Sequence, residues 1–190
     1  YLFNSGGQLV YIGETNGNFL LFDYDIEKGL ISKITTSKNI SMEFVYYNES
    51  DKQNNQQEID VLTIKEVKLP DGSKINYNYT NSRLSSVVKH GSNNEEDITY
   101  TYLYDADKNL TQIYDAEGNP YKFEYDDKKR VTKVIYPHNN ALYEEAVALE
   151  YSNNATQTTT KKLVNGNTRC FDVDYFDNYF GNCIKSIDAE

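Results

Sequence analysis

The sequence predicts an all-β protein built of tandem β-hairpin repeats that form one continuous, curved antiparallel sheet. Three observations predict it: short segments alternate aromatic and polar residues, each of them ends on a tyrosine, and each runs into Asp, Asn or Gly. Alternation with a period of two is typical of a strand with one buried face, and Asp, Asn and Gly are typical turn residues. The 18 tyrosines supply the large rings that such a thin sheet needs for its core.

The clearest strand-like segment is 121–125, with the sequence Tyr-Lys-Phe-Glu-Tyr. Its three rings fall on one face of a strand and its two charges on the other. Segments 75–79 and 100–104 repeat the pattern, and weaker copies are 20–24, 147–151 and 171–175. The terminal tyrosines recur at intervals of about 21 to 33 residues, a period that indicates a repeat array. They are Tyr24, Tyr46, Tyr79, Tyr104, Tyr125, Tyr151 and Tyr175.

After the turn a short return strand is predicted, marked by two apolar residues three positions apart. Residues three apart on a regular strand face opposite sides, so the pattern predicts either a β-bulge or partial burial of both faces. The apolar pairs are Leu9 and Ile12, Ile31 and Ile34, Leu84 and Val87, Leu110 and Ile113, Val131 and Val134, and Ile184 and Ile187. A second turn, again rich in Gly, Asn and Asp, leads to the next hairpin.

The whole chain, residues 1–190, is predicted to be a single repeat array, with a wholly polar insertion loop at about 48–58. We expect it to be a fragment of a longer chain, because it opens inside a strand-like segment and its tail echoes residues 113–117 without completing the repeat. Cys170 and Cys183 are expected to be free thiols. A hairpin of strands 168–175 and 182–188 would place Cys170 opposite Ile187 and Cys183 opposite Asp174, too far apart for a disulfide.

The net charge of −10 argues against nucleic acid as a partner, since phosphates would be repelled. No apolar run approaches the roughly 18 residues of a membrane span, so no membrane insertion is expected.

The combination of Tyr-x-Tyr-Asp, a turn, an apolar-x-x-apolar return strand and a second turn resembles the YD repeats of bacterial RHS and wall-associated proteins, and of the teneurins. Segments 102–119 and 123–134 match best, while the copies at Tyr46, Tyr151 and Tyr175 lack the Asp. The resemblance implies a sheet that winds into a spiral shell, of which this chain would be an open fragment. In complete members the shell can enclose a C-terminal toxin or present an extracellular surface, so the resemblance implies a secreted or bacterial cell-surface location.

No catalytic residue, cofactor or metal site is expected. Residues Asp105, Asp107 and Asn109 open like an EF-hand loop, but Leu110 and Ala116 occupy its glycine and glutamate positions. A hairpin turn explains the three polar residues, and weak calcium binding is left as an alternative.

Two functions remain open. The first is a non-catalytic structural scaffold or shell of a larger surface or toxin-carrying protein, with its own toxin or cargo domain as partner. The second is a carbohydrate-binding or adhesion module for cell-wall or host glycans, with Tyr77, Tyr102 and Tyr125 as ligand-stacking candidates. The same rings would otherwise form the buried face of the sheet. An exposed aromatic patch on the sheet would favour the second function.

Overall fold

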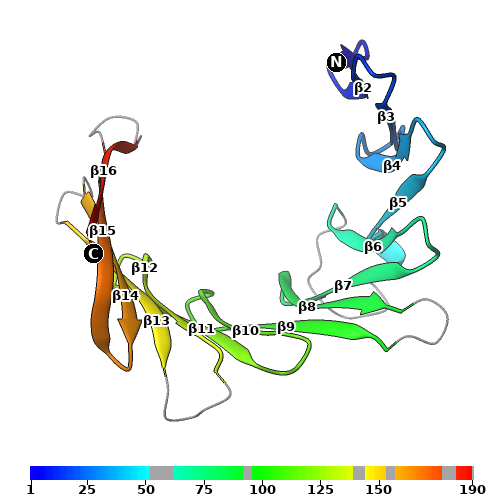
Figure 1. Cartoon of the computed structure of the whole chain (residues 1–190). Helices are drawn as coiled ribbons and strands as arrows, with labels where there is room; N and C mark the ends of the chain where they lie inside the picture. The colour runs from blue at the N-terminus through cyan, green and yellow to red at the C-terminus, as the bar shows by residue number, and fades with distance from the viewer. Residues whose placement is uncertain (52–61, 92–95, 139–143, 153–156, 177–182, 190) are drawn as a thin grey trace. The chain divides into compact units, whose positions relative to one another are not determined.

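A computed structural model describes residues 1–51, 62–91, 96–138, 144–152, 157–176 and 183–189. Sixteen strands occur in these ranges (Figure 1). Their bounds are β1 Leu2–Phe3, β2 Leu9–Gly13, β3 Phe19–Tyr24, β4 Ile31–Thr36, β5 Ser41–Tyr46, β6 Ile64–Lys68, β7 Lys74–Thr80, β8 Arg83–His90, β9 Ile98–Tyr104, β10 Leu110–Tyr114, β11 Pro120–Tyr125, β12 Val131–Tyr136, β13 Glu145–Tyr151, β14 Gln157–Val164, β15 Asn167–Phe176 and β16 Cys183–Ala189.

The sheet order of the strands is their order in the chain, and neighbouring strands run antiparallel. This confirms the predicted all-β class and the antiparallel hairpin topology. The chain divides into two compact units, residues 1–100 and 101–190, which are described separately below. The predicted insertion loop at 48–58 lies mostly outside the described residues. No helix among the described residues is long and apolar enough to cross a membrane.

The return strands β4, β6, β8, β10 and β12 carry a β-bulge opposite the tyrosine that ends the strand before them, whereas β14 pairs with β13 in regular register. In unit 1, Tyr24 pairs with Ile31 and Phe22 with Ile34, so three residues on β3 oppose four on β4. The same arrangement pairs Tyr125 with Val131 in unit 2. The apolar residues three apart thus reach one face because the bulge inserts one residue between them. The predicted bulge is confirmed.

A half-buried tyrosine at the end of a strand reaches back to the strand before it, in an interaction that we call the tyrosine clamp. Its hydroxyl donates a hydrogen bond to the backbone carbonyl of the residue that opens the preceding strand. Clamps of this kind join Tyr24 to Leu9 (2.8 Å), Tyr46 to Ile31 (2.8 Å), Tyr125 to Leu110 (2.7 Å) and Tyr151 to Val131 (2.7 Å). Burial raises the pKa of Tyr46 and of Tyr125, which keeps both hydroxyls protonated as donors.

Seven turns within the described ranges share one backbone geometry. In the turn that starts at Asp105, the Asp105 amide donates to the Asn109 carbonyl (3.0 Å) and the Lys108 amide donates to the Asp105 carbonyl (3.1 Å). This is a type I turn followed by one residue in the left-handed region, a common hairpin connection. The left-handed residues are Gly7, Gly17, Asn39, Gly72, Lys108, Gly118 and Lys129. Glycine and asparagine accept positive φ readily, whereas the two lysines do so at a cost.

Replacing Lys108 with glycine is therefore expected to stabilise the protein by about 0.5–1 kcal/mol, because the lysine holds φ at 74°. The reverse change in the next turn, Gly118→Lys at φ 82°, should destabilise it by about 1–2 kcal/mol. Urea unfolding of both variants against the parent chain checks the pair. Equal stability of Lys108→Gly and the parent would show that the turn relaxes around the lysine.

The β15–β16 register corrects the expectation for the cysteines. Cys183 pairs with Phe176, not with Asp174, and Asp174 pairs with Ser186 instead. Ile187, expected opposite Cys170, pairs with Val173. Cys170 lies opposite Lys162 of β14 and is a free, half-buried thiol.

Candidate functional site

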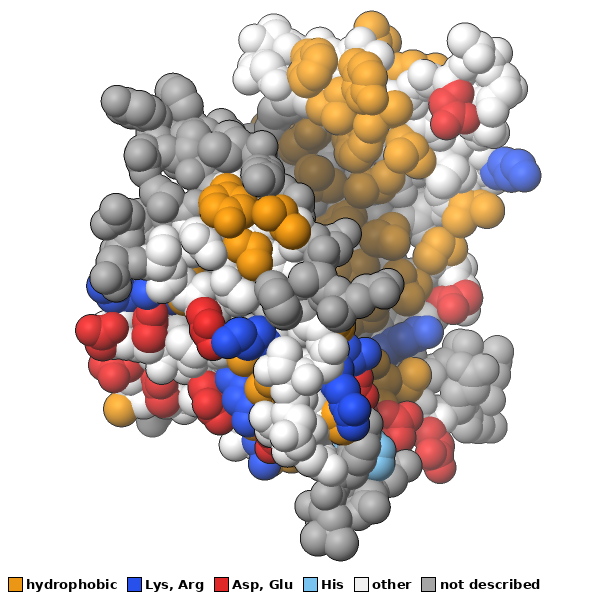
Figure 2. Space-filling model, turned by 60° about the vertical axis from the view of Figure 1, so that its left-hand side comes forward, with side chains coloured by type: hydrophobic (Ala, Val, Ile, Leu, Met, Phe, Trp, Pro, Cys, Tyr) orange, Lys and Arg blue, Asp and Glu red, His pale blue; other side chains and the backbone are white. Residues whose placement is uncertain are grey.

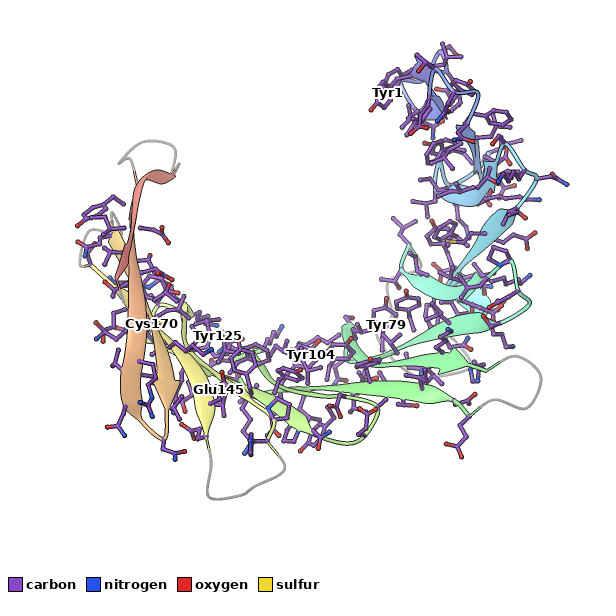
Figure 3. The ribbon with its side chains drawn as sticks, in the orientation of Figure 1. Tyr1, Tyr79, Tyr104, Tyr125, Glu145 and Cys170 are labelled. Atoms are coloured by element: carbon purple, nitrogen blue, oxygen red, sulfur yellow. The ribbon has the colours of Figure 1, made fainter. Side chains whose placement is uncertain are left out.

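The three tyrosines proposed to stack on a ligand are not brought together. Tyr77 lies in β7 of unit 1, whereas Tyr102 in β9 and Tyr125 in β11 belong to unit 2. All three rings are half-buried, and each has an exposed strand neighbour. The Tyr125 hydroxyl is engaged in a clamp. The residues Tyr104 and Tyr125 share one face of the sheet in unit 2 (Figure 3). This placement fits the buried-face alternative, and stacking by the three rings stays a prediction.

A more exposed aromatic group lies on that face of unit 2, where strands β11 to β14 meet. The rings of Tyr121 and Tyr136 are 6.0 Å apart and nearly perpendicular, at 78°. With Pro137, Glu145, Val147 and Lys162 they line an open cleft of about 470 Å³, which we call the aromatic corner. Tyr136 is 41% exposed. The exposed part of the Tyr136 ring is therefore accessible to a flat, partly apolar ligand.

Strand register builds the aromatic corner. Lys122 pairs with Ile135, which sets the adjacent Tyr121 and Tyr136 beside each other across β11 and β12. Tyr136 then pairs with Glu145, labelled in Figure 3, at the start of β13. The cleft is completed because Val147, two residues on from Glu145, pairs with Lys162 of β14. Sequence analysis missed this group because Tyr136 belongs to no alternating segment; its one signal is the Tyr-Pro step that ends a strand.

The charges of the aromatic corner nearly cancel. The Lys162 ammonium lies 3.2 Å from the Glu145 carboxylate, and both side chains are partly exposed. An ion pair at this exposure contributes little stability but offers both a donor and an acceptor to a ligand. A cationic ligand would have to compete with Lys162 for the carboxylate. The aromatic corner therefore favours an uncharged ligand that carries hydroxyl groups.

The carboxylate of Asp105 is engaged within its own turn. It accepts hydrogen bonds from the backbone amide of Asn109 (2.8 Å) and from the side-chain amide of Asn109 (2.9 Å). The described residues hold no group of three or more His, Cys, Asp or Glu side chains that could bind a metal ion. The hairpin turn thus accounts for the polar residues that open like an EF-hand loop.

The stability of the protein should fall at acidic pH because three turn carboxylates have lowered pKa values. Hydrogen bonds hold their pKa values below the usual range: from the Ser73 hydroxyl to Asp71, from the Asn109 side chain to Asp105, and from the Arg130 backbone amide to Asp126. A lowered folded-state pKa adds stability above the unfolded value of about 3.9, and this stability is lost as pH falls through the folded-state pKa.

The urea midpoint should therefore stay level from neutral pH to about 5 and fall below about 4. A triple variant with Asn at these three positions keeps the acceptor oxygen without the charge, so its midpoint should fall less steeply. An equally steep fall in the triple variant would show that other carboxylates cause the acid sensitivity.

Comparison with known proteins identifies one repeat directly. The family model of the RHS repeat matches residues 104–141, which span the turns at Asp105, Asp115 and Asp126 and the clamp of Tyr125. The predicted resemblance to RHS repeats is confirmed there. No curated protein gives a significant match.

Solved structures extend the likeness to the fold of nearly the whole chain. The crystal structure of TcdB2-TccC3 without its hypervariable C-terminal region superposes with a TM-score of 0.61, at 12% identity, over 97% of this chain and 10% of that chain. TcdB2-TccC3-TEV gives 0.43 at 12% identity, over 93% and 12%, and a Photorhabdus luminescens Tc holotoxin pore gives 0.42 at 12%, over 98% and 12%. The first of these structures shares the fold of this chain. The chain spans about a tenth of the length of that structure.

Proposed function

We propose that this chain is a non-catalytic structural segment of a larger bacterial RHS-repeat protein, in which it forms part of a scaffold or shell for a surface or toxin-carrying protein. The observation that carries the proposal is the recurring hairpin, with its bulge, its tyrosine clamp and its capped turn. The hydroxyls of Tyr24 and Tyr125 and the turn carboxylates of Asp105 and Asp126 are engaged in structural hydrogen bonds. The fold likeness to TcdB2-TccC3 supports the same reading.

The proposed partner is the protein's own toxin or cargo domain, and the proposed location is outside the cell or at the bacterial surface. Protease treatment of the full-length protein, purified from its host, tests this role. We expect a segment beyond the repeats to resist cleavage until the array is unfolded by urea. Cleavage of that segment at the rate of the isolated segment would contradict a shell, and the array would then be a surface module.

The aromatic corner supports a second candidate function, binding of an uncharged glycan. A pyranose ring could stack on Tyr121 or Tyr136, with its hydroxyls bonded to Glu145 and Lys162. Titration with soluble oligomers of N-acetylglucosamine and of glucose, followed by tyrosine fluorescence and calorimetry, tests this candidate. Binding should be lost in Tyr136→Ala and kept in Tyr100→Ala, a similarly exposed tyrosine outside the cleft. No binding by either oligomer, or equal binding by both variants, would remove it.

A further inference from the structure

A row of side chains crosses strands β2, β3 and β4 of unit 1 on one face and continues to Ile40, the residue before β5. Ile12 of β2 pairs with Leu20 of β3, and Leu20 pairs with Thr36 of β4. The Thr36 amide then donates to the Ile40 carbonyl (2.9 Å) across the turn to β5. These four residues line an open cavity of about 380 Å³, with Glu14 and Lys38 at its rim. We call it the cross-strand groove.

The floor of the groove is largely apolar, yet water reaches it. Ile40 is 48% exposed although it continues the row of Ile12 and Leu20. Hydrophobic side chains gather over the N-terminal strands, in the upper part of Figure 2. Covering these side chains would remove apolar surface from water, which is favourable by about 25 cal/mol per Å².

The dimensions of the groove fit an extended polypeptide. Neighbouring strands lie about 4.8 Å apart, so a row of four side chains at this spacing is about 14 Å long. An extended chain rises about 3.4 Å per residue, and about four residues therefore span the row. Alternate side chains of such a segment point the same way, so two apolar side chains, two positions apart, would face Leu20 and its neighbours.

The charged residues that line the groove favour a polypeptide over an anionic lipid as its ligand. Glu14 follows β2 at one side of the groove, and Lys38 lies in the turn between β4 and β5 at the other. Rim charges of opposite sign complement a segment with a basic residue at one end and an acidic residue at the other. An anionic lipid would meet Glu14, and the chain as a whole carries −10.

We propose that the cross-strand groove binds an extended polypeptide segment in which two apolar side chains, two positions apart, are flanked by a basic and an acidic residue. The proposal rests on strands β2 to β5 alone and does not require the array to be part of a shell. If the groove binds no such segment, the proposed scaffold role is unaffected. If the protease experiment contradicts a shell, the proposal for the groove is likewise unaffected.

Fluorescence anisotropy with the labelled peptide Arg-Leu-Ser-Leu-Glu tests the proposal. We expect saturable binding to the full chain that weakens about tenfold in Ile40→Asp, because the aspartate places a charge on the apolar floor. The matched control is Ile26→Asp, at an isoleucine that is 99% exposed and does not line the groove, and it should bind as the parent does. Equal weakening in both variants would overturn the proposal.

A charge reversal tests the orientation of the segment without touching the floor. Lys38→Glu should weaken Arg-Leu-Ser-Leu-Glu and strengthen Arg-Leu-Ser-Leu-Arg, each by about three- to tenfold at low salt. Lys28→Glu carries the same net charge at an exposed site outside the groove and should leave the preference unchanged. The same shift in both variants would contradict the proposal, as would equal binding of a peptide with serine in place of both leucines. Binding of a neutral detergent that is weakened by Ile40→Asp, with no binding of either peptide, would overturn the proposal and assign the groove to an uncharged lipid instead.

Discussion

Replacing Tyr47 with alanine is expected to destabilise unit 1 by about 3–5 kcal/mol, the largest single effect we predict. Tyr47 is 6% exposed in a chain whose side chains are mostly half-buried. Its ring meets Tyr79 edge to face at 5.7 Å and 85°, and its hydroxyl donates to the Tyr77 carbonyl (3.0 Å). The Lys65 ammonium lies 5.6 Å from the centre of the ring. Alanine would remove all of these interactions and leave a cavity.

Phenylalanine at position 47 separates the ring from the hydroxyl. Tyr47→Phe keeps the packing against Tyr79 and loses the hydrogen bond to Tyr77, so it should cost about 1 kcal/mol. Urea unfolding followed by circular dichroism measures both variants. If alanine and phenylalanine cost the same, the ring contributes little and Tyr47 is not the centre of the unit 1 core.

Removing the four clamp hydroxyls together should cost about 4 kcal/mol, divided between the units. Each Tyr→Phe change removes one hydrogen bond to a backbone carbonyl and is expected to cost about 1 kcal/mol. Separate sites add, so the changes at Tyr24 and Tyr46 should lower the stability of unit 1 by about 2 kcal/mol. The changes at Tyr125 and Tyr151 should do the same for unit 2.

The control for the clamp variants is Tyr100→Phe, at a tyrosine that is half-exposed and forms none of the four clamps. It should unfold within about 0.5 kcal/mol of the parent chain. An unchanged urea midpoint in the fourfold variant would mean that water replaces the hydroxyls at no cost, and that the clamps do not hold the repeats.

Local sequence predicted the hairpins well because their signals lie close together in the chain. On the first strand of a hairpin, the aromatic residue and the terminal tyrosine are two positions apart, whereas the apolar residues paired with them on the return strand are three positions apart. The extra residue on the return strand forms the bulge. The pair Ile64 and Val67 was missed although it opposes Tyr46 and Phe44, because the polar insertion separates it from its tyrosine. Nothing in the composition indicated that Lys108 and Lys129 would take the left-handed position.

The predictions that failed or were missed depend on pairing between strands. In most repeats the residue after the terminal tyrosine opens a turn, but Tyr47 at that position is buried against Tyr79. Tyr151 pairs with Thr158 and Thr158 with Asp174, so the neighbouring Tyr175 faces the opposite side of the sheet from Tyr151. Alternation along one strand cannot show which face its partner presents. The same limit hid the aromatic corner, whose residues come from four strands.

Residue-resolved amide hydrogen exchange of the native chain tests the central claim most directly, that the same hairpin recurs along the sheet. The amides of Asp105, Asp115 and Asp126 each donate to the carbonyl four residues on, and those of Asn4 and Glu14 do so in unit 1. We predict that all five exchange slowly, at rates close to those of the adjoining strands. Rapid exchange at these five positions, with protection confined to scattered strands, would contradict a recurring hairpin.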